Sequence, residues 1–342
     1  MSIKSKEEIE AVKTQSKLEL QNLYHLIENS TERLVPLYGV IENYFFQDID
    51  IQKLKPLIPL WMVDAGHSPE SLVSKNCFDK LRQVYSDSLA NRIIHWSDVQ
   101  LLLGALQDRL MAVKNHLIQF YQYLPCYCLY DDNDYESSKR ILDNSSDIVH
   151  AAANNVFVSL NSSFDLLTKI VYECSHYDAT GFDKYKKMKS RKKSALYNKG
   201  NYGFDELKTD GLLYSEPVCI RTVCSFRDEF LHNGAWDYRC AIYYPIIAGE
   251  HVEPFVVMPD IDEKGVLVSS GSRNKFYIGR KKLNVEFPRL VTDVFLVLDR
   301  TITTFHDVLT RKTVTKDKGF ATRAALRILQ HNQEILNGYY QR

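Results

Sequence analysis

Apolar residues recur every three or four positions along most of the chain, which is the spacing of helices that bury one face. This pattern predicts helices at about 5–30, 31–46, 69–90, 96–122, 147–175, 217–232, 288–312 and 319–338. The clearest apolar stripe lies in 147–175, at Val149, Ala153, Val156, Leu160, Phe164, Leu167 and Val171. Pro56 and Pro59 separate the second helix from the third. We therefore expect a mainly helical protein.

The pattern changes between about 240 and 287, where short runs of β-branched and aromatic residues alternate with turn residues. The runs AIYYPII, EPFVVM, GVLVSS and KFYIG are typical of strands and predict a small antiparallel β insertion. Further upstream, residues 131–147 are acidic and polar, which predicts a domain boundary. The expected fold is a mainly α helical bundle, with a helical N-terminal domain at 1–130 and a second helical domain at 147–342.

Composition narrows the class of protein without identifying a partner. Lys and Arg together number 43, as do Asp and Glu, so any basic surface must be local. The 7 cysteines are odd in number and include no CxxC pair, which argues against a disulfide framework or a zinc knuckle. No run is apolar enough to span a bilayer, and the charged start lacks the apolar region of a signal peptide. We expect a cytoplasmic protein without a membrane partner.

One segment, CIRTVCSFRDEFLHNGAW, contains Arg-x4-His, with Arg227 and His232 at its ends. Ser215 is expected to cap the helix that carries this segment, with Pro217 in the first turn. A short motif of this kind also arises by chance. The looser spacing Arg-x4–6-His occurs at two further places, Arg109–His116 and Arg300–His306. The local context must therefore choose among the three.

The context favours Arg227 and His232. The predicted helix has an apolar stripe made of Cys219, Val223, Phe226 and Phe230. Arg227 is rooted on this stripe, and a cation there needs a partner or a charged ligand, because a lone buried charge is costly. His232 lies in the last turn, before an expected cap at Asn233-Gly234, where the helix dipole favours a protonated imidazole that can donate its proton. Asp228 precedes His232 by four, so the two share a face and could contact and orient one another.

This segment resembles the HEPN family of helical nucleases. The hallmark of that family is Arg, a polar residue, three further residues and His, late in the last core helix. FRDEFLHNG fits this form, with Asp228 in the polar position. The helix at 147–175, with SLNSSFDLL at its middle, resembles the HEPN helix that packs against the motif helix. The resemblance covers about 147–236 and leaves residues 1–130 and the β insertion unexplained.

The resemblance implies an endoribonuclease that needs neither a metal nor a cofactor. The 2′-hydroxyl of the RNA is the nucleophile. His232 would move the protons, Arg227 would bind phosphate oxygens, and Asp228 would complete the site. The products would be a 2′,3′-cyclic phosphate and a 5′-hydroxyl end. The resemblance also implies a homodimer and a role as a toxin or an antiviral-defence effector, with an antitoxin or another defence-system protein as a partner.

Other residues could support such a site. Asn161 and Asp165 lie on the helix expected to face the motif, where they either hold Arg227 or serve as capping or surface residues. The loop at 178–210 carries a basic run that either follows an RNA backbone or is a solvated linker. This run consists of Lys184, Lys186, Lys187, Lys189, Arg191, Lys192 and Lys193.

An interpretation from a different class explains the same residues without catalysis. Arg227 would pair only with Asp228 or Asp165, and His232 would only cap the end of its helix. The protein would then be a helical binding or scaffold protein whose HEPN-like domain holds a nucleotide or a protein partner.

Overall fold

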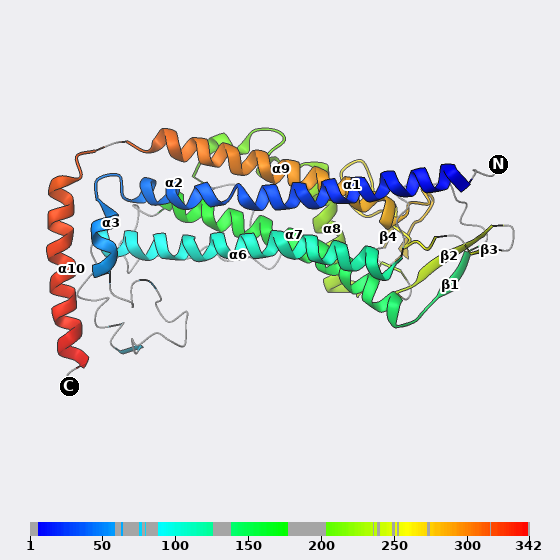
Figure 1. The fold of residues 1–342 in the computed structure, drawn as a ribbon, viewed down its shortest axis with the longest axis horizontal. Coiled ribbons are helices and arrows are strands. Elements are labelled where there is room, and N and C mark those ends of the chain that lie inside the picture. Colours follow the sequence, from blue (N-terminus) through cyan, green and yellow to red (C-terminus); the bar gives the residue numbers. More distant parts are fainter. Residues whose placement is uncertain are drawn as a thin grey trace. The chain divides into compact units, whose positions relative to one another are not determined.

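The computed structural model describes residues 6–58, 63, 75, 76, 79, 88–125, 138–176, 203–234, 236, 237, 240–247, 250, 251, 253–271, 274–314 and 316–340. Most of them are helical (Figure 1). The α-helices are α1 (Lys6–Glu32), α2 (Val35–Phe45), α3 (Ile51–Leu54), α6 (Ser88–Tyr123), α7 (Asn144–His176), α8 (Val218–Asn233), α9 (Leu283–Lys312) and α10 (Gly319–Tyr340). Short 3-10 helices are η1 (Lys55–Leu57), η5 (Asp205–Lys208) and η6 (Leu213–Ser215).

Two small antiparallel sheets accompany the helices. The first has the strand order β1-β2-β3, and the second pairs β4 with β5. The strands are β1 (Ser138–Ile141), β2 (Ile242–Ile247), β3 (Glu250–His251), β4 (Ser269–Ser270) and β5 (Asn274–Lys275). The prediction of a mainly helical fold with an antiparallel β insertion is confirmed. The likeness of the C-terminal half to HEPN proteins stays a proposal.

The chain divides into two compact units, each assembled from three separate stretches. Unit 1 comprises Met1–Arg33, Gln107–Phe164 and Lys208–Thr301. Unit 2 comprises Leu34–Leu106, Asp165–Leu207 and Ile302–Arg342. Both units take residues from both sides of 131–147. They therefore differ from the two predicted domains, whose boundary stays a prediction.

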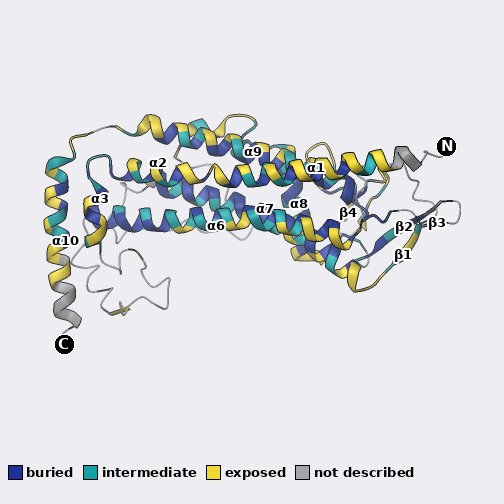
Figure 2. Ribbon diagram, viewed as in Figure 1, coloured by how far each residue is buried: buried dark blue, intermediate teal, exposed yellow. Residues whose placement is uncertain are grey.

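The first half of α7 is a central element of unit 1 and shows why its sequence forms a helix. Asp143 precedes the helix, and its carboxylate accepts a hydrogen bond from the Ser146 N–H at 2.9 Å. The Ser146 hydroxyl in turn accepts from the Asp143 N–H at 3.0 Å, so the two residues form a reciprocal cap. The predicted apolar stripe of this helix is buried throughout, from Val149 to Val171, and Figure 2 shows buried and exposed positions on different sides of the helices.

Helix α9 starts earlier than the sequence predicted. The helical pattern was placed at 288–312, whereas the helix begins at Leu283. Inside a helix Pro288 has no N–H to donate to the carbonyl of Asn284. The hydroxyl of Tyr121, on α6, donates to that carbonyl instead, at 2.8 Å. A tertiary contact therefore satisfies the backbone where the helix itself does not.

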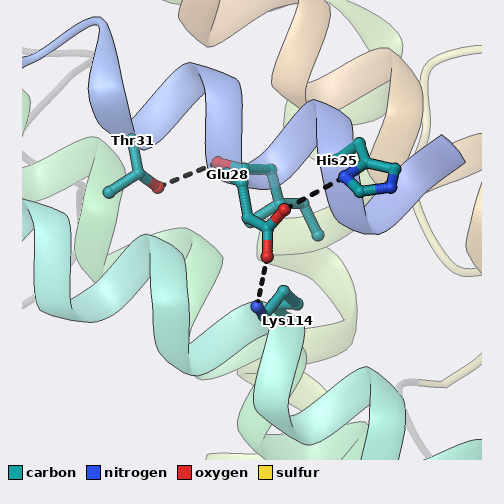
Figure 3. A network of polar contacts seen from close by, with 5 residues as sticks. His25, Glu28, Thr31 and Lys114 are labelled. Carbon is teal, nitrogen blue, oxygen red and sulfur yellow. Dashed lines mark hydrogen bonds and ion pairs between the residues drawn. The ribbon is translucent and has the colours of Figure 1, made fainter. Parts of the chain in front are cut away.

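A polar network joins α1 to α6 within unit 1 (Figure 3). The carboxylate of Glu28 accepts from Lys114 at 2.6 Å and lies 3.2 Å from the ring of His25. These two partners, Lys114 first, lower the pKa of Glu28. The Thr31 hydroxyl donates to the Ile27 carbonyl one turn earlier in α1. The contact between Glu28 and Lys114 therefore links the two long helices α1 and α6.

Unit 2 combines an apolar core with a buried contact between a histidine and a carboxylate. Phe46 and Trp96 meet edge to face, with ring centroids 5.8 Å apart. His95 of α6 and Glu173 of α7 are almost fully buried, and Nδ1 lies 2.8 Å from Oε2. Helix α10 packs against α3. The pairing of the two buried groups compensates part of the cost of removing them from water.

One strand, β1, was not predicted from the sequence, and two predicted features lie outside the described residues. β1 forms inside the polar segment 131–147, because Lys139 and Arg140 stay exposed while the backbone pairs with β2. The predicted helix at 69–90 lies almost entirely outside the described residues. The same holds for the basic run 184–193 in the predicted loop.

Candidate active site

Helix α8 carries the motif, and its two ends differ in how well the sequence predicted them. Pro217 is the N-cap residue, so Ser215 does not cap the helix as predicted. Ser215 ends η6, where its hydroxyl accepts from the Gly211 N–H and donates to the Leu212 carbonyl. The C-terminal prediction is confirmed. Gly234 has a φ of 90° and its N–H donates to the Phe230 carbonyl, a conformation that favours glycine.

The apolar side of α8 packs into an aromatic cluster. Phe226 stacks on Phe157 of α7, with ring centroids 4.7 Å apart and an interplanar angle of 6°. Trp236, just beyond the helix, stands edge to face against Phe226 and Phe230 at 5.2 and 4.3 Å. Its indole N–H donates to the Val257 carbonyl at 3.0 Å. The predicted stripe is shifted by one residue at its start, because Ile220 is buried and Cys219 only half-buried.

The three predicted catalytic residues lie on the solvent side of α8. Arg227 and Asp228 form an ion pair, with Nη1 2.6 Å from Oδ1 and side chains 32% and 59% exposed. His232 is exposed in the last turn of the helix. Within the described part of the chain, His232 makes no hydrogen bond or ion pair. The structure therefore pairs Asp228 with Arg227, and the predicted contact between Asp228 and His232 is not formed.

The spacing of Arg227 and His232 limits how they could share a ligand. Five positions correspond to about 140° around an ideal helix and about 7.5 Å along its axis. The two side chains therefore leave the helix in different directions. One phosphate could contact both only if the long arginine side chain turned toward the end of the helix, which would first separate it from Asp228.

The predicted supporting residues have other surroundings. Asn161 is buried, and its side-chain oxygen accepts a hydrogen bond from the thiol of Cys224 at 3.2 Å. No hydrogen bond joins Asn161 to Arg227 among the described residues, so Asn161 binds a different position of α8. Asp165 is half-buried on α7 and belongs to unit 2. Its role as a partner of Arg227 stays a prediction, as does the role of the run Lys184–Lys193, which lies outside the described residues.

A third side of α8 faces the β insertion through polar contacts spaced by four residues. The guanidinium of Arg221 donates to the Lys264 carbonyl at 2.5 Å. The Ser225 hydroxyl accepts from the Leu267 N–H at 3.0 Å. Glu229 pairs with Lys275 at 2.8 Å. The insertion therefore follows α8 from its first turn almost to its last.

The loop at the start of this contact requires glycine. Gly265 has a φ of 83°, and a side chain there would lie 2.5 Å from the Val218 carbonyl oxygen and 2.9 Å from the Thr222 hydroxyl. Both the conformation and the close approach therefore exclude larger residues. Asp262 tightens the same loop, since its carboxylate accepts from the N–H groups of Lys264 and Val266.

Sequence reasoning missed the contacts of Ser225, Glu229 and Lys275. The four-residue spacing of polar positions on α8 was visible, and it could have indicated a second packed face. The run KFYIG, which begins at Lys275, was predicted as a strand, but β5 comprises only Asn274–Lys275, and the sequence does not show that it faces α8.

Burial raises the pKa of two side chains of unit 1. Burial and the charge of Asp293 raise the pKa of the Cys219 thiol to about 11, which keeps it protonated. Burial, followed by the charge of Asp237, raises the pKa of Tyr243 to about 12. In the part of the chain that the structure describes, no group of three His, Cys, Asp or Glu side chains could hold a metal ion. No described helix is long and apolar enough to cross a membrane.

Comparison with known proteins adds no relative. A scan against protein-family models, a search of curated proteins and a search of solved structures each find no match. The residues of α8 and their surroundings are therefore the basis for proposing a function.

Proposed function

We propose that the protein is a metal-independent endoribonuclease of HEPN type, with its site on the solvent side of α8. The observation that carries the proposal is the position of His232. It is an exposed imidazole in the last turn of a helix whose other two sides are fixed by an aromatic cluster and by the β insertion. An accessible imidazole on a rigid support is suited to general acid–base catalysis.

The roles follow from the side chains. The ribose 2′-hydroxyl attacks the adjacent phosphorus, and the bond to the 5′-oxygen of the next nucleotide breaks. His232 takes the proton from the 2′-hydroxyl while water gives one to the leaving oxygen, or His232 gives the proton to the leaving oxygen while water takes the one from the hydroxyl. Arg227 turns from Asp228 to the phosphate oxygens and stabilises their developing charge. The products are a 2′,3′-cyclic phosphate and a 5′-hydroxyl end.

The resemblance supplies the rest of the proposal. Two copies of the chain form a homodimer with their α8 helices near the two-fold axis, so that two motifs flank one RNA strand. The protein acts as a toxin or an antiviral-defence effector, in association with a further protein of that system. Sedimentation tests the assembly: a monomer that still cleaves RNA at high dilution contradicts it.

The test is RNA cleavage in EDTA by the wild-type protein and matched variants. His232→Ala should reduce the rate by about 10²–10⁴-fold, the usual contribution of a general acid or base. Arg227→Ala should reduce it by about 10²–10³-fold, as for a charge-stabilising donor. His116→Ala and His306→Ala are the controls and should cleave normally. Normal cleavage by His232→Ala excludes this site.

A second candidate is a helical binding or scaffold protein without catalysis. The Arg227–Asp228 ion pair favours it, because this contact already satisfies the arginine within the chain. In that case neither the wild-type protein nor Asp228→Asn, which releases Arg227, cleaves RNA under any condition. Cleavage that depends on Arg227 and His232 excludes it.

A further inference from the structure

Two hydrogen bonds hold Trp236, which follows α8 closely in the chain. They restrict the helix end that carries His232. Trp236 donates from its indole to Val257 and accepts at its backbone carbonyl from the hydroxyl of Tyr277. Burial, followed by the charges of Asp237, Tyr243 and Glu229, raises the pKa of Tyr277, so its hydroxyl stays a donor. β5 (Asn274–Lys275) ends two residues before Tyr277.

Lys275 reaches the same helix end directly. Its ammonium lies 2.8 Å from the carboxylate of Glu229, and the two side chains are only 8% and 11% exposed. The same carboxylate oxygen of Glu229 accepts from the side-chain amide of Asn233 at 2.9 Å. Asn233 follows His232 and is the last residue of α8. One carboxylate thus connects β5, the third turn of the helix and its final residue.

Such a pair is better suited to fixing geometry than to stabilising the fold. Removing two charges from water costs about as much as their attraction returns, so an apolar pair would serve stability equally well. The two charges do, however, define one register between the hairpin and the helix. His232 itself has no side-chain anchor among the described residues, so its position depends on the backbone of the last turn.

We propose that Glu229 and Lys275 are positioning residues that hold the last turn of α8, and with it His232, in place for the proposed cleavage. This inference rests on the proposed function. It assigns a task to the β insertion, which the HEPN resemblance leaves unexplained. Neither residue touches the substrate, and both act through the position of His232.

The first test needs no RNA. Hydrogen–deuterium exchange of the full chain compares the last turn of α8, residues 230–234, with its first turn, residues 219–224. In Lys275→Met and Glu229→Gln the last turn should exchange about tenfold faster, while the first turn changes less than about threefold. The exposed Asn233→Ala, which keeps the ion pair, should loosen only the last turn. Lys114→Met removes an ion pair between α1 and α6 and should leave α8 unchanged.

The charge swap Glu229→Lys with Lys275→Glu shows whether the single variants act through the lost ion pair or through a general folding defect. It should restore exchange to within about threefold of the wild type, since the Asn233 side-chain amide can turn its oxygen to accept from the new ammonium at position 229. Faster exchange throughout α8, or no change in the single variants, overturns the proposal. Failure of the swap to restore exchange also overturns it.

Cleavage kinetics test the link to His232. The single variants and Asn233→Ala should lower kcat by about tenfold or more with KM changed less than about twofold, because the substrate contacts remain. The charge swap should recover kcat. A loosened last turn with normal kcat overturns the positioning role. A wild-type protein that cleaves no RNA overturns the proposed function instead, and exchange alone then decides whether the pair holds the helix end.

Discussion

The buried side and the solvent side of α8 differ in how many contacts their residues make with the rest of the protein. On the buried side, Phe226 and Phe230 pack into rings from α7 and the segment after the helix. On the solvent side, Arg227 has one partner, Asp228, and His232 has none among the described residues. The buried side therefore accounts for stability. The solvent side contributes little to the fold, so its residues must be judged by chemistry instead.

The buried side should give the largest loss of stability. Phe226→Ala removes a ring that stacks on Phe157 and meets Trp236 edge to face, and should lower the free energy of unfolding by about 3–5 kcal/mol. Leu231→Ala, on the same helix but 53% exposed, is the matched control and should stay within about 0.5 kcal/mol. Urea denaturation measures both. Equal losses in the two variants would remove the distinction between the sides.

A buried histidine beside the same aromatic cluster should make the stability of the protein depend on pH. His150 is buried, tilts against Trp236 and lies 2.9 Å from the Ala241 carbonyl. Burial lowers the pKa of His150, and the Ala241 hydrogen bond and the charges of Asp237 and Asp147 oppose this only in part. As pH falls through about 6.5, the unfolded chain binds a proton that the folded chain resists, so stability decreases.

His150→Gln keeps a hydrogen-bond donor and removes this titration. The difference in unfolding free energy between wild type and variant should therefore shrink as pH falls from about 7.5 toward 5, because only the wild type loses this contribution. Urea denaturation across that range measures it. Parallel curves for the two proteins would show that the burial of His150 has no such effect.

The exposed ion pair should matter far less to stability. Arg227→Ala and Asp228→Ala should each change the free energy of unfolding by less than about 1 kcal/mol, as is typical of surface salt bridges, and the difference should shrink at high salt. Arg227→Ala should nevertheless abolish most of the cleavage. A loss comparable with that of Phe226→Ala would mean that the arginine is structural.

The smallest effect is expected at the network of Figure 3. Glu28→Gln removes an exposed carboxylate whose pKa is lowered by Lys114 and His25. A lowered carboxylate pKa gives stability above its unfolded value of 4.5 that is lost as pH falls through the folded value. Thermal melting should therefore show a slight loss in the variant near neutral pH and none in strong acid. A loss that persists in strong acid would assign it to packing.

Periodicity predicted the buried side of these helices much better than their polar contacts. The predicted apolar stripe of α7 is confirmed, because burial selects apolar residues at helical spacing whichever element packs against them. The predicted end of α8 at Gly234 is confirmed because a positive φ at the cap favours glycine, which the sequence shows directly.

Features that depend on distant partners were not predictable. The start of α9 was misplaced because Tyr121 satisfies the carbonyl that Pro288 leaves. Asn161 was a candidate partner of Arg227, with a capping or surface role as the alternative, yet it binds Cys224, because spacing along α7 does not identify the facing residue of α8. β1 was missed because its backbone pairing with β2 outweighs the polar composition of its segment.

The chemistry proposed for His232 and Arg227 is tested most directly by the ends of the cleaved RNA. The protein is incubated in EDTA with an oligoribonucleotide and, separately, with the same strand carrying a 2′-deoxynucleotide at one cleavage position. The masses of the products are measured by mass spectrometry. The account predicts 2′,3′-cyclic phosphate and 5′-hydroxyl ends, no cleavage at the deoxy position, and intact RNA with His232→Ala. Cleavage at the deoxy position, or products with 5′-phosphate ends, would contradict it.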